Sequence, residues 1–182
     1  GIIGITTGSL CAQNATSTKI ALGVCDTLQT FPSFVYLIPV MMLFGITDTS
    51  VLIAVIIYAT IPATRYTIEG LRSVPSALHD AASMSGVTRI QRLFQIEFPL
   101  AFPHIMLGIN QTVVFALFMV IIGAFIGTED LGQYIMKALS DNKGAGKALI
   151  LGLCVAFIGL AVDNLIRTWA EKKKKLLGLE EY

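Results

Sequence analysis

The chain has 182 residues, of which 54% are hydrophobic and 14% are charged, and its formal net charge is +1. Soluble globular proteins carry about a quarter charged residues, so this composition favours burial in lipid over an oversized core. The near-neutral charge argues against a nucleic-acid partner, which would call for a basic face. The chain opens at Gly1 without a basic leader, and we expect a single transmembrane domain over residues 1–182 from which an N-terminal part is missing.

The first half of the chain predicts a short apolar stub followed by two apolar segments, given that a bilayer core of about 30 Å needs about 20 apolar residues. Pro32 and Pro39 interrupt the first of these segments, so we expect a broken helix that faces the interior of the bundle, where protein covers the freed backbone groups. The expected boundaries are a stub over 1–10, a polar turn over 12–19, the broken span over 20–45, a turn over 47–50 and an apolar run over 51–63 that ends near Pro62 and Arg65.

A partly polar segment, about residues 69–97, follows that run and is the least apolar part of the middle of the chain. Pro75 suits the first turn of a helix, and Gly86 suits a sharp turn that only a residue without a Cβ adopts freely, so a short helix and a break are predicted. Beyond the break, four apolar residues recur at helical spacing: Val87, Ile90, Leu93 and Phe94. This pattern predicts an amphipathic helix along the membrane surface, which leaves the short helix free to project.

The remainder predicts two further spans, over residues 98–126 and 148–167, a hydrated loop over 128–147 and a tail over 168–182. Short loops rich in Lys and Arg stay in the cytoplasm. Ten Lys and Arg residues lie on the side of the polar segment, the tail and the first turn, against three on the other side. The polar segment and the tail are therefore expected to be cytoplasmic.

The sequence carries no pattern of catalytic or metal-binding residues, which predicts that the chain is not an enzyme. The run from Gly144 to Lys147 lacks the spacing and the hydroxyl of a phosphate loop, so ATP, if used, is bound elsewhere. His79 and His104 lack metal-ligand spacing and are expected to be satisfied structural histidines. Three widely spaced cysteines are expected to be packing residues rather than disulfides or metal ligands: Cys11, Cys25 and Cys154.

The polar segment resembles the cytoplasmic loop of membrane subunits of ATP-binding-cassette importers, whose pattern is Glu-Ala-Ala, three residues, Gly, nine residues, Ile, one residue and Leu-Pro. Asp80 replaces the Glu and Phe98 the Leu, and every spacing is kept. The residues that carry this resemblance are Asp80, Ala81, Ala82, Gly86, Ile96 and Pro99. Four further segments resemble permeases for glycine betaine, proline, choline and carnitine: residues 26–39, 108–112, 126–127 and 131–132.

The resemblance implies an all-α polytopic transmembrane bundle in a bacterial or archaeal inner membrane, acting in ATP-driven import of osmoprotectants. It implies that the loop docks on partner ATPase subunits, which bind ATP and Mg, while this chain binds no cofactor. A second permease subunit, as in a homodimer, and an extracytoplasmic substrate-binding protein or fused binding domain are implied as well. Ala81 and Ala82 are small enough to let a helix sink into a groove, Gly86 sets the angle to the next helix, and Asp80 offers a charge near a helix end.

Two sets of residues are candidates for the translocation pathway. Aromatic residues beside the proline breaks could pass a quaternary ammonium over their ring faces, or they could simply pack in the bundle: Phe31, Phe34 and Tyr36. Polar residues near the middle of the membrane could line a path, or they could be hydrogen-bonding links between helices: Asn110, Gln111 and Thr112. Asp163 and Arg167 are expected to form an ion pair on one helix face. The lysines at 172–175 are expected to contact anionic lipid or to fix the topology.

Three alternatives remain open from the sequence. The same architecture could import a different small amine, an amino acid or a sulfonate. An ion-coupled secondary transporter also combines broken helices with mid-membrane polar residues. A channel or a purely structural subunit would lack a specific ATPase partner.

Overall fold

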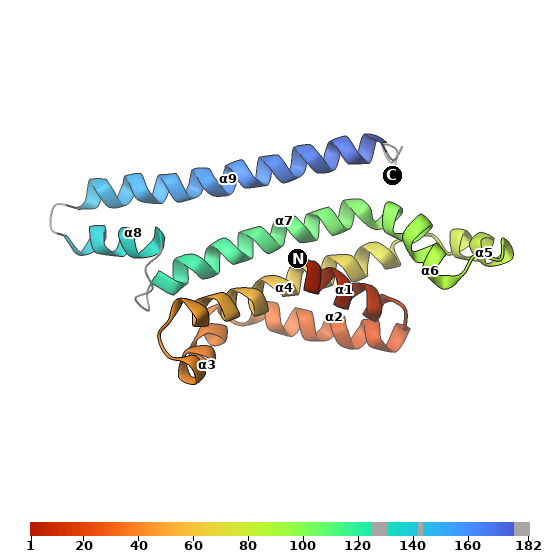
Figure 1. Ribbon diagram of the computed structural model, residues 1–182, viewed down its shortest axis with the longest axis horizontal. Coiled ribbons are helices and arrows are strands. Elements are labelled where there is room, and N and C mark those ends of the chain that lie inside the picture. The colour runs from red at the N-terminus through yellow and green to blue at the C-terminus, as the bar shows by residue number, and fades with distance from the viewer. Residues whose placement is uncertain (125–130, 142–143, 177–182) are drawn as a thin grey trace.

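The computed structural model describes residues 1–124, 131–141 and 144–176; residues 125–130, 142–143 and 177–182 lie outside this description. The described part is built from helices and contains no strand (Figure 1), which confirms the predicted all-α class. In chain order the elements are α1 (Ile2–Ala12), α2 (Ala15–Thr30), α3 (Phe34–Phe44), α4 (Asp48–Arg72), α5 (Ser76–Met84), α6 (Arg89–Arg92), the π-helix η1 (Leu93–Glu97), α7 (Phe98–Gly123), α8 (Leu131–Ser140) and α9 (Ala145–Leu176).

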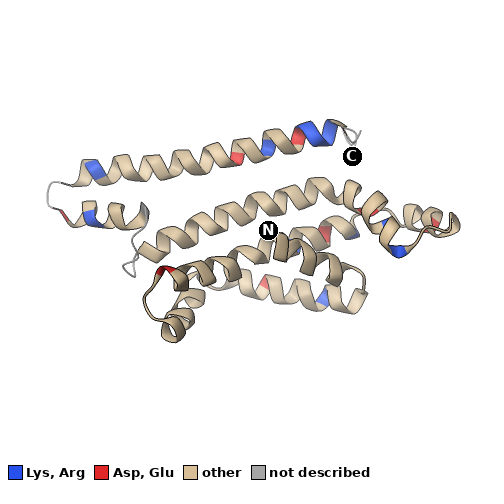
Figure 2. Ribbon diagram, in the orientation of Figure 1, with Lys and Arg blue, Asp and Glu red and all other residues tan. Residues whose placement is uncertain are grey.

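Within the described ranges, three helices are long and apolar enough to cross a membrane: α4, the helix that runs from α6 through η1 into α7, and α9. The pair α2 and α3 passes the same test together but is bent by 89° at its junction, so it is a broken span or a re-entrant loop. The polytopic bundle predicted from the sequence is thereby confirmed. Figure 2 shows Lys and Arg residues around α5 and α6 and along the last part of α9, which lie at the same end of the molecule.

The helix α4 is the centre of the bundle and packs against α1, α2, α3 and α7. Glycines permit its closest contacts. A Cβ added at Gly4 of α1 would lie 2.5 Å from the Ala63 Cβ, and one added at Gly8 would lie 2.8 Å from the Thr67 Cβ. Gly108 of α7 likewise meets Tyr66. Small residues therefore let the backbones of α1 and α7 approach α4 directly, as is common between membrane helices.

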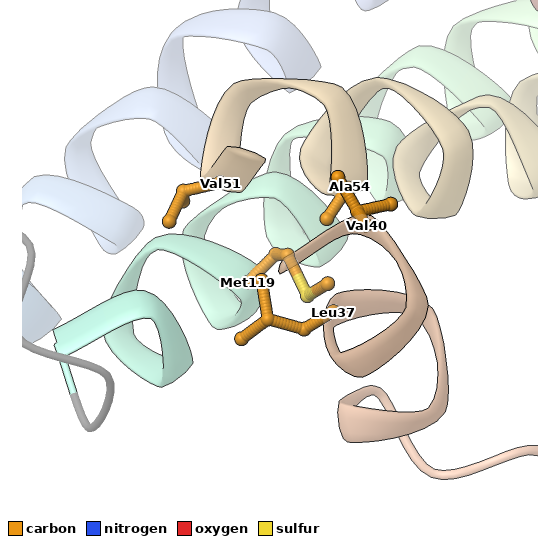
Figure 3. Packing of buried hydrophobic residues seen from close by; sticks show 5 residues of the cluster. All are labelled: Leu37, Val40, Val51, Ala54 and Met119. Atoms are coloured by element: carbon orange, nitrogen blue, oxygen red, sulfur yellow. The ribbon is translucent and has the colours of Figure 1, made fainter. Parts of the chain in front are cut away.

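A cluster of buried apolar side chains joins α3, α4 and α7 (Figure 3). It lies toward the end of the bundle opposite α5 and α6 (Figure 1). Leu37, Ala54 and Met119 are fully buried there, and Val40 and Val51 complete the cluster. This packing holds the short helix α3 against the long helices, so the broken α2–α3 pair is attached to the bundle at the α3 end.

The apolar run that is expected to end near Pro62 and Arg65 lies within a longer helix, because α4 continues to Arg72. A proline inside a helix removes one backbone hydrogen bond, and membrane bundles tolerate this where neighbouring helices pack around the site. Ile61, Pro62 and Ala63 are all buried. The first residues assigned to the polar segment, 69–72, are thus the last turn of α4.

Two other loop boundaries also differ from the prediction. The polar turn expected over 12–19 is limited to Gln13 and Asn14, and α2 begins at Ala15. The loop expected over 128–147 contains the ten-residue helix α8. Of the two prolines expected to break the 20–45 span, Pro32 lies at the break between α2 and α3, whereas Pro39 lies inside α3.

The prediction of a separate amphipathic helix along the membrane surface is wrong, because α6 and η1 run without a break into α7. Pro99 lies near the start of α7 and cannot donate to the carbonyl four residues earlier. In the π-turn the Phe98 N–H donates to the Leu93 carbonyl, five residues back. This wider turn absorbs the proline, so the polar segment passes directly into the span.

Candidate functional site

The candidate coupling loop consists of α5, the turn at Gly86 and α6. Gly86 has φ +72°, and a Cβ added there would meet no described atom within 4 Å, so the backbone conformation alone favours glycine. Thr88 then caps α6 with a capping box: its hydroxyl accepts from the Gln91 N–H at 3.3 Å, and its own N–H donates to the Gln91 side chain at 3.0 Å. The turn between α5 and α6 is therefore fixed from both sides.

The motif residues divide between the surface and the interior of the loop. Asp80 and Ala81 are exposed, whereas Ala82 is only 4% exposed and packs within this chain. Ile96 and Pro99 are half-buried at the base of the loop. Of the motif residues, Asp80 and Ala81 thus offer a free surface for docking, and the exposed apolar side chain of Met84 extends it.

Glu97 attaches α5 to the start of the span, and sequence reasoning missed it. Its side chain is 12% exposed, and its Oε1 accepts from the Arg92 Nε at 2.8 Å and lies 3.2 Å from the His79 Nδ1. His79 therefore has the structural partner expected of it. His104 does not, because its buried Nδ1 has no hydrogen-bond partner among the described residues. A lone acid at the border of an apolar span was the available signal for Glu97.

A cleft of about 900 Å³ lies under this loop, between the α1–α2 turn, the end of α4 and α6. Arg72, Arg89 and Arg92 contribute three guanidinium groups to its lining, together with His79. The Arg72 Nη1 donates to Thr18 of α2 at 3.2 Å. Glu97 also lines the cleft and pairs with Arg92, so the lining keeps an excess of positive charge and favours anionic over cationic groups.

The aromatic pathway candidates lie at the α2–α3 break. The Tyr36 hydroxyl donates to the Leu28 carbonyl across that break. Its ring lies 5.1 Å from the ring of Tyr58, which stacks on Phe115 of α7 at 4.8 Å. Phe31 and Phe34 are each 42% exposed. Tyr36 therefore closes the break and also begins a row of three rings, Tyr36, Tyr58 and Phe115, across the bundle.

The polar pathway candidates point in different directions. The Asn110 amide donates to the Asp163 carboxylate of α9 at 2.6 Å, and the Arg167 Nε contacts the same carboxylate at 2.9 Å, which confirms the expected Asp163–Arg167 pair. Asn110 is thus a link between helices. The Thr112 hydroxyl donates to the Gly108 carbonyl of its own helix. Gln111, in contrast, lines a second cavity, between α2, α4 and α7.

An ion-pair cluster beside that cavity was not predicted as a site. The Arg65 Nη1 lies 2.8 Å from the Asp26 carboxylate, and its Nε donates to Glu69 at 2.9 Å. The same Nη1 donates to the Gln29 amide oxygen at 2.9 Å. The sequence signals were Asp26 and Gln29 one turn apart in an apolar span and the i,i+4 pair of Arg65 and Glu69.

Comparison with known proteins agrees with the helical architecture. A family model described as the binding-protein-dependent transport system inner membrane component matches residues 4–175. The chain is 78% identical over 178 residues to the trimethylamine N-oxide transport system permease protein TmoV of Pelagibacter ubique, which covers 98% of this chain and 25% of that protein. TmoV of Ruegeria pomeroyi is 48% identical over 178 residues, with 98% and 27% covered.

The glycine betaine/proline betaine transport system permease protein ProW of Escherichia coli is 37% identical over 164 residues, which cover 90% of this chain and 46% of that protein. The chain spans about a quarter of the length of the TmoV relatives and about half that of ProW.

Proposed function

This chain belongs to the family of binding-protein-dependent transport system inner membrane components and is a multi-pass inner-membrane protein, and we propose that it is the permease part of an ATP-driven importer of small methylated amines. The geometry of the coupling loop carries this proposal. Asp80 and Ala81 lie exposed on a short helix whose angle is set by Gly86 and whose base is held by Glu97. A helix fixed in this way can pass the motion of a docked partner to the spans as a rigid body.

The proposed partners follow from this mechanism. ATPase subunits that bind ATP and Mg dock on α5, a second permease subunit completes the pathway, and an extracytoplasmic binding protein or fused binding domain delivers the cargo. This chain itself binds no cofactor. ATP-driven closure of the ATPase pair moves the two docked loops, and the spans then alternate between outward-open and inward-open states.

The proposed cargo carries a nitrogen with three methyl groups and a negatively charged oxygen. Relatives named for trimethylamine N-oxide transport are 78% and 48% identical to the chain, whereas the relative named for glycine betaine and proline betaine is 37% identical. We therefore place trimethylamine N-oxide first and glycine betaine second. Another amine, an amino acid or a sulfonate remains an alternative that the same assay distinguishes.

The test is uptake by the complete transporter, made from the full polypeptide, its ATPase subunits and its receptor in proteoliposomes. We expect labelled trimethylamine N-oxide to accumulate when ATP is supplied on the ATPase side, and to stop accumulating with a non-hydrolysable analogue. Uptake that ignores ATP and follows an ion gradient would support the secondary-transporter alternative. Absence of a specific ATPase partner in a mild-detergent pull-down would support the channel or structural alternative.

A further inference from the structure

A small cavity of about 240 Å³ lies between α2, α4 and α7, and it shares no lining residue with the basic cleft under the coupling loop. Pockets for drug-sized ligands measure about 300–1,000 Å³, so this one suits a smaller molecule. It combines one cation, one carboxylate, two amides and two aromatic rings, which are Arg65, Glu69, Gln29, Gln111, Tyr66 and Phe115.

Arg65 gives this cavity an anion-binding group with capacity to spare. A guanidinium has five N–H donors. The described contacts of Arg65 to Asp26, Gln29 and Glu69 use its Nε and Nη1 atoms. Among the described side chains, the two N–H groups of Nη2 are therefore left for another acceptor. An oxygen that carries negative charge is the acceptor that guanidinium donors bind most strongly.

The remaining charges around the cavity favour a positive group on the same ligand. Arg65 contributes one positive charge, and Asp26 and Glu69 contribute two negative ones, so the cluster has an excess of one negative charge. Tyr66 and Phe115 line the cavity, and Phe115 has one ring face stacked on Tyr58, which leaves the other; aromatic rings attract methylated ammonium groups over their faces. A dipolar molecule with a methylated cationic nitrogen and an anionic oxygen satisfies both halves of this lining.

The position of the cavity suits a step on a transport route. Arg65 lies seven residues before Arg72, the last residue of α4, which is about 10 Å along a helix at ~1.5 Å per residue. Phe115, in the lining, is the inner member of the row of rings that starts at Tyr36 beside the α2–α3 break. The rings therefore lead from the broken span to the cavity that Arg65 also lines.

We propose that this cavity is a cargo-binding site within the permease, in which Arg65 binds the anionic oxygen of the cargo and Tyr66 and Phe115 contact its methylated nitrogen. The inference rests on the proposed function, since it assumes that the chain transports such a dipole. Binding involves no covalent step. It requires only that the anionic oxygen of the cargo accepts hydrogen bonds from Arg65, while Asp26 and Glu69 balance the positive charge on the cargo nitrogen.

The experiment uses the complete transporter in proteoliposomes and measures uptake of labelled trimethylamine N-oxide and receptor-stimulated ATPase activity in the same vesicles. We expect Arg65→Gln to lower cargo moved per ATP about tenfold or more, as for loss of a charged hydrogen bond. Phe115→Leu should lower it about threefold, as for loss of one cation–π contact. ATPase activity should stay within about twofold in both. The matched control is Arg167→Gln, which removes a guanidinium with a similar i,i+4 carboxylate partner outside the cavity.

Each result separates the two proposals. Unchanged uptake in Arg65→Gln and Phe115→Leu would overturn the cavity as a cargo site. A parallel loss of ATPase activity and uptake would also overturn it, by showing a structural or coupling role. If the Arg65→Gln variant does not assemble, the cargo moved per ATP by Phe115→Leu and Gln111→Ala decides whether the cavity is a cargo site. A wild-type transporter that takes up no methylated amine with ATP would instead contradict the proposed function.

Discussion

Glu97 links the coupling helix α5 to the start of the membrane span. Its Oε1 atom contacts both Arg92, on α6, and His79, on α5. It therefore links the two helices on either side of the turn at Gly86. The carboxylate is nearly buried, and removing it leaves the Arg92 Nε without its acceptor, which costs about 1–3 kcal/mol, and also removes the contact to His79.

We therefore expect Glu97→Ala to lower the thermal stability of the purified complex and to lower uptake relative to ATP hydrolysis. Both are measured on one preparation, by thermal unfolding in detergent and by coupled transport assays. Gln95→Ala is the control, because Gln95 is exposed two residues away. Equal behaviour of the two variants would show that Glu97 does not position α5.

Gly86 tests whether the backbone turn itself matters for coupling. Its φ of +72° costs most side chains about 1–2 kcal/mol, whereas Asn adopts this conformation more readily. Since an added Cβ would meet no described atom within 4 Å, steric crowding within the chain plays no part. We expect the cargo moved per ATP to fall in the order Gly, Asn, Ala, Val. An order that follows side-chain size without sparing Asn would point to crowding against the docked ATPase instead.

At the scale of the element, α1 depends on two glycines spaced four apart. Cβ atoms at Gly4 and Gly8 would come within 2.8 Å of α4, including its backbone. We expect Gly4→Ala and Gly8→Ala each to separate α1 from α4 and to lower the thermal unfolding temperature of the complex. Gly23→Ala is the matched control, because a Cβ there meets no described atom within 4 Å and Ala favours helix by about 1 kcal/mol. Destabilisation of all three alike would remove the packing explanation.

The prolines show which element boundaries the sequence could predict. Pro32 ends α2 because Phe31 before it takes an extended conformation, with ψ 135°. Pro39 and Pro62 are chemically identical to Pro32, but each lies inside a helix that packs against its neighbours. Pro39 is in α3 and Pro62 is in α4, and both helices pack together with α7. The sequence alone predicts that a proline removes one backbone hydrogen bond of a helix. Whether the helix continues through the proline depends on tertiary packing. The π-turn before Pro99 is the same case.

The candidate sites show a similar limit. The coupling loop was predictable because its residues lie within one short segment with fixed spacing, from Asp80 to Pro99. The contact of Arg65 with Gln29 spans 36 residues and joins two helices. No local pattern determines that these two side chains meet. The same holds for Asn110 and Asp163, which lie 53 residues apart.

At the scale of the whole molecule, charge is distributed along the long axis of the bundle. The coupling loop and the lysines at the end of α9 lie at one end, and α8 lies at the other (Figures 1 and 2). Ten Lys and Arg residues against three predict that the α5 end is cytoplasmic. The structure determines which segments lie at the same end of the bundle, and the bias in Lys and Arg predicts which end faces the cytoplasm.

Impermeant thiol reagents test this orientation in intact cells. After replacement of the natural cysteines of the full polypeptide, Lys137→Cys on α8 should be labelled from outside, because Lys137 is exposed on the side opposite the loop. Ser85→Cys, exposed at the end of α5, should be labelled only after permeabilisation. Transport activity of each variant serves as the control for folding. Labelling of Ser85→Cys in intact cells would place α5 outside, where no ATPase could dock on it, and would contradict the coupling mechanism together with the orientation.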